Sequence, residues 1–137
     1  MTPSEPGSYR QALAFANAAR QRAFARAAQV RFEVAVTRAL TGQRPWYSRW
    51  YRPPRGREPF ADAIDQGLRN DPAYAGAVDE MMRYLATAVR YARRRGHRGD
   101  HVLRWLLRQL VLLLRPLVGE NAAVDRVAEL VTGRRGP

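Results

Sequence analysis

Apolar and polar residues along the chain follow a helical period, and start and stop signals mark the helix ends. Ser8 and Gln11 have the spacing of a capping box, and no Gly or Pro follows until Gly42. This pattern predicts one long helix over residues 9–40. Its larger apolar side chains are scattered around the helix, so alanine content rather than a single apolar face carries the prediction.

The best-marked helix is predicted over residues 72–95. Asp71 is placed as its N-cap, Pro72 occupies the first helical position, and Gly96 supplies a stop. Apolar residues separated by three or four positions form a face suited to packing on other helices. These residues are Tyr74, Val78, Met81, Leu85, Ala88 and Ala92.

Three shorter helices are predicted over residues 60–68, 101–117 and 122–132, the last with Asn121 as its N-cap. The helix over 101–117 contains so many apolar residues that we expect it to be mostly buried, with one narrow basic stripe. The stripe consists of His101, Arg104, Arg108 and Arg115.

No segment shows the alternation of a strand, so the expected fold is all-α, a compact bundle of about five helices. The length of 137 residues fits a single domain over 1–137. We expect flexible ends at 1–7 and 133–137.

Between the first two helices, residues 43–59 form a predicted loop rich in proline, aromatic residues and arginine. Rings that stack on bases and guanidinium groups that hold phosphates would suit a single strand. Alternatively, some of the rings anchor the loop onto the bundle. The candidate contacts are Arg44, Trp46, Tyr47, Arg49, Trp50, Tyr51, Arg52, Arg55 and Arg57.

The chain has a net charge of +12, from 24 basic residues, all of them arginine, and 12 acidic residues. Arginine grips phosphate with two bonds, and a surplus this large attracts polyanions. Codon bias would explain the absence of lysine but not the surplus. Residues 8–57 hold eleven arginines and one acid, and residues 93–119 hold seven and one. The intervening residues 58–92 hold three arginines and six acids.

Two groups of arginines within the basic blocks are candidate phosphate contacts. Arg20, Arg31 and Arg38 project within about 20° of one another along roughly 27 Å of helix. For this first group a solvated helix face is the alternative. A second group gathers after residue 92, where positive charge also complements the negative end of the helix. The second group consists of Arg93, Arg94, Arg95 and Arg98.

The basic stripe on the helix over 101–117 must reach solvent, a ligand or carboxylates, because an unpaired buried guanidinium is costly. Internal partners are available in the acidic block. The candidates are Asp62, Asp65, Asp79 and Glu80.

Residues for catalysis or cofactor binding are sparse. The chain has no cysteine and only two histidines, His97 and His101, so we expect no metal site and no cofactor. It also lacks a phosphate-cradling glycine loop and any marked nucleophile, and we expect no enzyme activity. Arginines interrupt the longest apolar stretch, 102–118, so we expect no transmembrane segment and a cytoplasmic location.

Residues 74–93, YAGAVDEMMRYLATAVRYAR, resemble a helix of the small subunits of multisubunit CRISPR effector complexes. The resemblance covers about twenty residues and implies a helical, non-catalytic subunit present in several copies along a guide RNA and its target. It also implies backbone contacts through arginines such as Arg20, Arg31 and Arg38. The aromatic segment 43–59 has no clear counterpart in that family.

The sequence therefore favours sequence-tolerant binding of RNA or single-stranded DNA, within a ribonucleoprotein that includes other protein subunits or copies of this chain. A protein-interaction adaptor that docks an acidic partner is the first alternative. Peripheral attachment to an anionic membrane is the second.

Overall fold

The computed structural model describes residues 5–40, 61–96 and 100–133. These ranges contain no strand, and the prediction of an all-α bundle with a long first helix is confirmed. The aromatic segment 43–59 lies outside the described residues, so its role stays a prediction. The helices are α1 (Tyr9–Leu40), α2 (Ala61–Arg69), α3 (Pro72–Arg95), α4 (His101–Val118) and α5 (Glu120–Thr132).

The helix ends follow the capping residues in the sequence at most positions. The Asp71 side chain accepts a hydrogen bond from the Tyr74 backbone N–H at 3.2 Å, and Asp100 accepts one from Val102 at 2.9 Å. Gly96 ends α3 in the left-handed region with φ 66°. Because these caps satisfy backbone groups that a helix leaves unpaired, they fix where α3 and α4 begin and where α3 ends.

The start of α5 differs from the prediction. Asn121 is not its N-cap, because the helix already begins at Glu120, directly after Gly119. Gly119 adopts φ 86°, donates its N–H to the carbonyl of Arg115, and accepts the N–H of Ala123 through its own carbonyl. One glycine in a conformation that L-residues rarely adopt therefore ends α4 and starts α5 without a side-chain cap.

Alanine forms the interface between the two longest helices. Ala12, Ala16, Ala19 and Ala23 of α1 are completely buried, and α1 makes its most extensive contact with α3. Side chains this small let two helix backbones approach closely, and the spacing of three and four residues keeps them on one face. The scattered larger residues of α1 concealed this alanine face in the sequence.

The larger core residues come from α3 and α4. Tyr74, Met81 and Leu85 of α3 are almost fully buried, and the Tyr74 hydroxyl donates a hydrogen bond to the backbone carbonyl of Leu113 in α4. Burial raises the pKa of the Tyr74 hydroxyl well above its ordinary value. The α4 residues in this core are Leu106, Leu110, Leu113 and Leu114.

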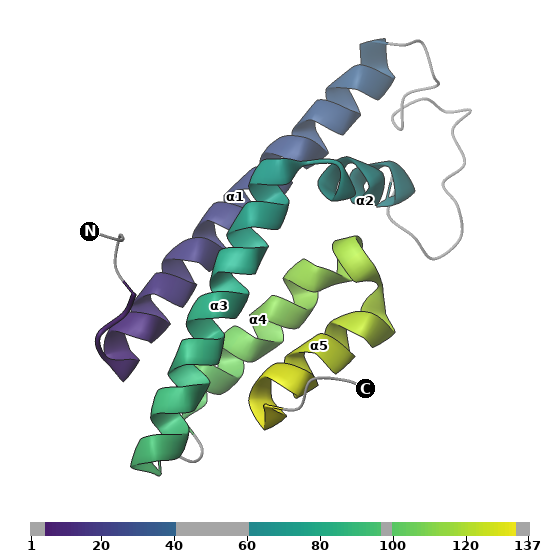
Figure 1. Cartoon of the computed structure of the whole chain (residues 1–137). Helices are drawn as coiled ribbons and strands as arrows, with labels where there is room; N and C mark the ends of the chain where they lie inside the picture. The colour runs from purple at the N-terminus through teal and green to yellow at the C-terminus, as the bar shows by residue number, and fades with distance from the viewer. Residues whose placement is uncertain (1–4, 41–60, 97–99, 134–137) are drawn as a thin grey trace.

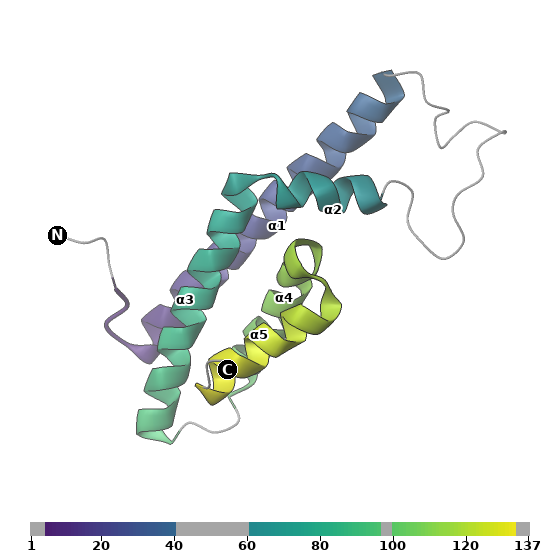
Figure 2. The ribbon, with the colours of Figure 1, turned by 45° about the vertical axis from the view of Figure 1, so that its right-hand side comes forward.

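The helices α1, α3, α5 and α4 are neighbours in that order around the bundle, as Figures 1 and 2 show. Both α1 and α5 contact α3 and α4, whereas α1 and α5 do not contact each other within the described residues. The seam between α1 and α4 and the seam between α3 and α5 therefore lie on opposite sides of the bundle. The short α2 packs against α1, α3 and α4 near one end.

Candidate nucleic-acid interface

One face of α4 is open to solvent and combines arginine with large apolar side chains. Arg104, Arg108, Trp105 and Leu112 are all exposed, the last two at 43% each. Residues three or four apart are neighbours on a helix surface, so these four side chains form one continuous patch. The prediction that α4 is mostly buried is wrong, because only its opposite face packs on the core.

Arg20 of α1 joins this patch by stacking on the tryptophan. Its guanidinium carbon lies 4.6 Å from the ring centroid of Trp105 and 5.7 Å from that of Phe24. The Arg20 Nε also donates a hydrogen bond to the Asn17 side chain at 2.9 Å. These contacts hold both the arginine and the indole in place while much of the Trp105 ring stays accessible.

We call this surface the α1–α4 edge and define it by Arg20, Phe24, Arg104, Trp105, Arg108 and Leu112. The helices α1 and α4 together carry nine arginines and one acid, Glu33, which gives a net charge of +8. By contrast, α3 and α5 carry six arginines and five acids, which gives a net charge of +1. The positive charge of the described residues is therefore concentrated on the helices that form the α1–α4 edge.

Two arginines of α1 face away from this edge and pair with acidic residues near α3. Arg22 forms an ion pair with Glu80, and Arg26 Nε lies 2.7 Å from an Asp71 carboxylate oxygen. The Arg26 guanidinium holds the pKa of the Asp71 carboxyl below its ordinary value, and the hydrogen bond from the Tyr74 N–H acts in the same direction. Both arginines thus connect α1 to α3.

Two arginines of the α4 basic stripe, Arg108 and Arg115, differ in their pairing among the described residues. Arg115 pairs with Glu120 at 3.2 Å, and Glu80 is taken by Arg22. Arg108 has no carboxylate within ion-pair distance among the described residues. Since Arg104, Arg108 and Arg115 are all exposed, the cost of burying their charge does not arise.

The predicted row Arg20, Arg31 and Arg38 does not form a uniform solvent-facing ladder. Arg20 is half-buried against α4, whereas Arg31 is exposed. Arg38 is half-buried and lines a depression between α1 and α2. The three residues share a helix direction, but each has different surroundings.

The predicted cluster at the end of α3 is divided between two sides of that helix. Arg93 faces α5 and donates a hydrogen bond to the backbone carbonyl of Val131. Arg94 lines a hollow of about 190 Å³ beside Glu5 and Pro6. Arg95 belongs to the last turn of α3.

Ten predicted contacts lie outside the described residues, so the structure places none of them. They are Arg44, Trp46, Tyr47, Arg49, Trp50, Tyr51, Arg52, Arg55, Arg57 and Arg98.

The sequence does not predict Trp105 as a contact, and for Arg104 and Arg108 it leaves solvent, a ligand and carboxylates open. They were assigned to a buried helix because α4 has more apolar residues than one packed face requires. A usable signal was present in the sequence, since Trp105 stands beside the basic stripe, at i+1 from Arg104 and i−3 from Arg108.

Across 5–40, 61–96 and 100–133, no group of three or more potential ligand residues could hold a metal ion. In the same ranges, no helix has the length and apolar character needed to cross a bilayer.

Comparisons with known proteins identify no relative of the chain. No protein-family model matches it, and no curated protein or solved structure is significantly similar to it.

Proposed function

We propose that this protein binds the backbone of RNA or single-stranded DNA without sequence preference, and that the α1–α4 edge is the principal contact surface. The observation that carries the proposal is the exposed Trp105 ring, held by Arg20 and flanked by Arg104 and Arg108 on a helix that contains no acidic residue. The role is one of binding, without catalysis.

The chemistry of the α1–α4 edge suits a single strand. A base can stack on an accessible indole whatever its identity, and arginine forks hold phosphate with two bonds. Asn, Gln, Asp and Glu, which pair with adenine and cytosine edges, are not among the six residues of the edge, and its only polar side chains are arginines. Binding through this surface would therefore depend on backbone charge and stacking, with little readout of sequence.

The same proposal gives the segment 43–59 a supporting role. Its rings and arginines repeat the composition of the α1–α4 edge, and the segment begins three residues after the end of α1. It would extend the contact along a strand beyond the helices.

Assembly with other subunits is a further part of the proposal. The resemblance of residues 74–93 to small subunits of CRISPR effector complexes favours a place within a multisubunit ribonucleoprotein. In the fold this stretch belongs to α3, and residues such as Tyr74, Met81 and Leu85 pack in the core. Its apolar pattern therefore also has a structural explanation.

The test is titration of the protein into fluorescein-labelled U20 and dT20 oligonucleotides, followed by fluorescence anisotropy at 50 to 200 mM NaCl. Three phosphate contacts should weaken single-strand binding about 20-fold over this range, and further contacts from 43–59 would steepen the dependence. A duplex of the same length should bind more weakly than U20. Absence of binding at 50 mM salt, or binding that ignores salt, would refute the proposal.

A further inference from the structure

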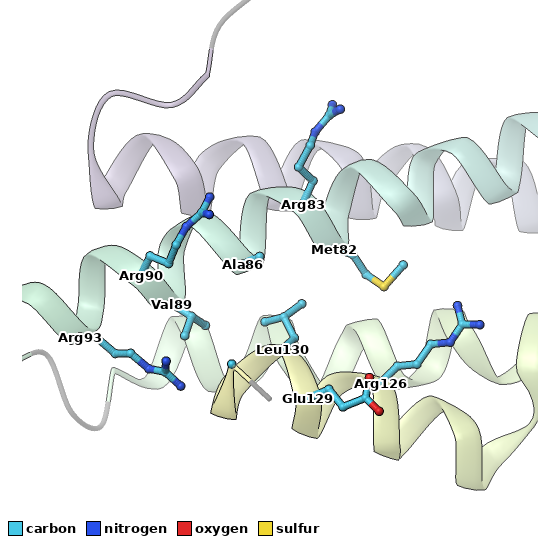
Figure 3. A pocket seen from close by; sticks show the side chains of 10 residues that line it. Met82, Arg83, Ala86, Val89, Arg90, Arg93, Arg126, Glu129 and Leu130 are labelled. Carbon is cyan, nitrogen blue, oxygen red and sulfur yellow. The ribbon is translucent and has the colours of Figure 1, made fainter. Parts of the chain in front are cut away.

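The opposite side of the bundle carries a groove of different character. It lies between α3 and α5 and has a volume of about 540 Å³. Met82, Val89 and Leu130 point into the space between the two helices (Figure 3). We call it the α3–α5 groove, and its remaining lining residues are Arg83, Ala86, Arg90, Arg93, Arg126, Glu129 and Gly133.

Charged groups lie along the outer margins of the groove rather than on its floor. Arg83 and Arg90 extend outward from α3, whereas Arg126 and Glu129 belong to α5 (Figure 3). Arg83 lies with its guanidinium carbon 5.4 Å from the ring centroid of Tyr84, and Arg90 donates a hydrogen bond to Thr87 at 3.1 Å. Neither arginine has a carboxylate within ion-pair distance among the described residues.

Arg93 has a structural role at one end of the groove. Its guanidinium donates to the Val131 carbonyl in the last turn of α5 and approaches Gly133, which ends that helix at φ 70°. This bond ties the end of α5 to α3. The groove is therefore a fixed space between two linked helices, and Arg83, Arg90 and Arg126 are its available cations.

These features fit a peptide better than a nucleic-acid strand. A phosphate backbone has no apolar side chains to place on a floor of methionine, valine and leucine. An apolar groove between two helices matches the way amphipathic helices dock, through anchor side chains spaced three, four and seven residues apart. The three available arginines at the margin would form ion pairs with carboxylates on such a peptide.

We propose that the α3–α5 groove binds an acidic amphipathic helix of a protein partner, with its apolar side chains in the groove and its carboxylates against Arg83, Arg90 and Arg126. Arg83 and Arg90 are seven residues apart, about 10.5 Å along α3. Acidic residues two turns apart on the docked helix match this spacing. The inference goes beyond nucleic-acid binding and does not depend on it.

The probe for this proposal is a synthetic 21-residue helix of leucine, glutamate and alanine, fluorescein-labelled, with leucines at helical spacing and glutamates flanking them. A peptide of the same composition but scrambled order is the control. We expect the amphipathic peptide to bind at least tenfold more tightly than the scrambled one, because only the former can seat its leucines in the groove. Equal binding of the two peptides would overturn the proposal.

Substitutions on the floor and at the margin of the groove test the contribution of each part to peptide binding. Ala86→Leu fills the floor and should weaken peptide binding at least fivefold, whereas Ala28→Leu, on the exposed surface of α1, should not change it. Arg83→Ala with Arg126→Ala should also weaken peptide binding while leaving U20 binding within twofold. Thermal unfolding of each variant checks that the fold is intact, and unchanged peptide binding in the folded Ala86→Leu protein would contradict the proposal.

Competition distinguishes this proposal from the proposed function. We expect the peptide and U20 to bind the same protein molecule simultaneously, because the two surfaces lie on opposite sides of the bundle. Displacement of the peptide by stoichiometric U20 would overturn the groove as a peptide site. Failure of U20 to bind, with peptide binding intact, would refute only the nucleic-acid proposal.

Discussion

The α1–α4 edge and the α3–α5 groove both present arginine, yet their surroundings differ. On the edge, arginines lie beside a partly exposed tryptophan, and the two helices that form the edge have a net charge of +8. In the groove, arginines border an apolar floor on helices with a net charge of +1. The comparison shows that a total charge of +12 does not identify a binding surface. The neighbouring acidic and apolar groups determine whether an arginine suits the phosphates of a nucleic acid or the carboxylates of a protein partner.

Matched pairs of arginine substitutions should separate the two surfaces most strongly. Arg104→Ala with Arg108→Ala removes two cations from the α1–α4 edge, and Arg83→Ala with Arg126→Ala removes two from the α3–α5 groove. The first pair should weaken U20 binding about 25-fold at 0.1 M salt and reduce the salt slope by about 1.4. Both pairs change the net charge equally, so long-range attraction is controlled. Equal losses in anisotropy titrations would abolish the distinction.

Trp105 should contribute next. Trp105→Ala is expected to weaken single-strand binding about five- to tenfold, toward the lower end of stacking energies because Arg20 already covers part of the ring. Leu112→Ala is the matched control, since Leu112 is equally exposed on the same helix but offers no aromatic face.

Rescue by an aromatic residue sharpens the test of Trp105. Trp105→Phe keeps a ring and should restore most of the affinity for U20. If the alanine variants of Trp105 and Leu112 lose the same affinity, stacking does not contribute to the α1–α4 edge.

The planar group of Arg20, as distinct from its charge, should affect stability more than ligand affinity. Arg20→Lys preserves the charge but loses the planar group that stacks on Trp105 and Phe24. We expect the free energy of unfolding to fall by about 0.5–1 kcal/mol, measured by urea denaturation. A variant with unchanged stability but weaker U20 binding would show instead that Arg20 serves the ligand directly.

Asp71→Asn should produce the smallest effect, a loss of stability that is present at neutral pH and disappears in acid. Its pKa is lowered in the folded state by Arg26, so the stabilisation is complete above the unfolded pKa and is lost as pH falls through the lowered value. Asp71→Asn keeps a capping side chain and should flatten the loss of stability below about pH 4. The same change at Asp79, an exposed aspartate of α3, should leave that acid dependence in place.

Most helix boundaries could be predicted from local sequence because capping is a local interaction. Asp71, Asp100 and Gly96 act within a few residues of their own position, and the structure places them as expected. The exception at Asn121 has the same origin. Both Asn121 and Gly119 carry signals for a helix boundary, and the backbone of Gly119 supplies the turn.

The binding surfaces could be predicted only in part because burial depends on neighbouring helices. The sequence of α4 contains enough leucine to cover two faces, and only packing against α1, α3 and α5 shows that Trp105 stays open. The stacking of Arg20 on Trp105 joins residues far apart in the chain. The α3–α5 groove likewise exists only once two separate helices lie together.

The most direct test of the central claim is an NMR titration of ¹⁵N-labelled protein with U20, followed through the backbone amide and tryptophan indole resonances. We expect the largest shifts within the described helices around Arg20 in α1 and from Arg104 to Leu112 in α4. Residues that line the α3–α5 groove should shift little. Largest shifts around Arg83, Arg90 and Arg126, with α4 unaffected, would contradict the account.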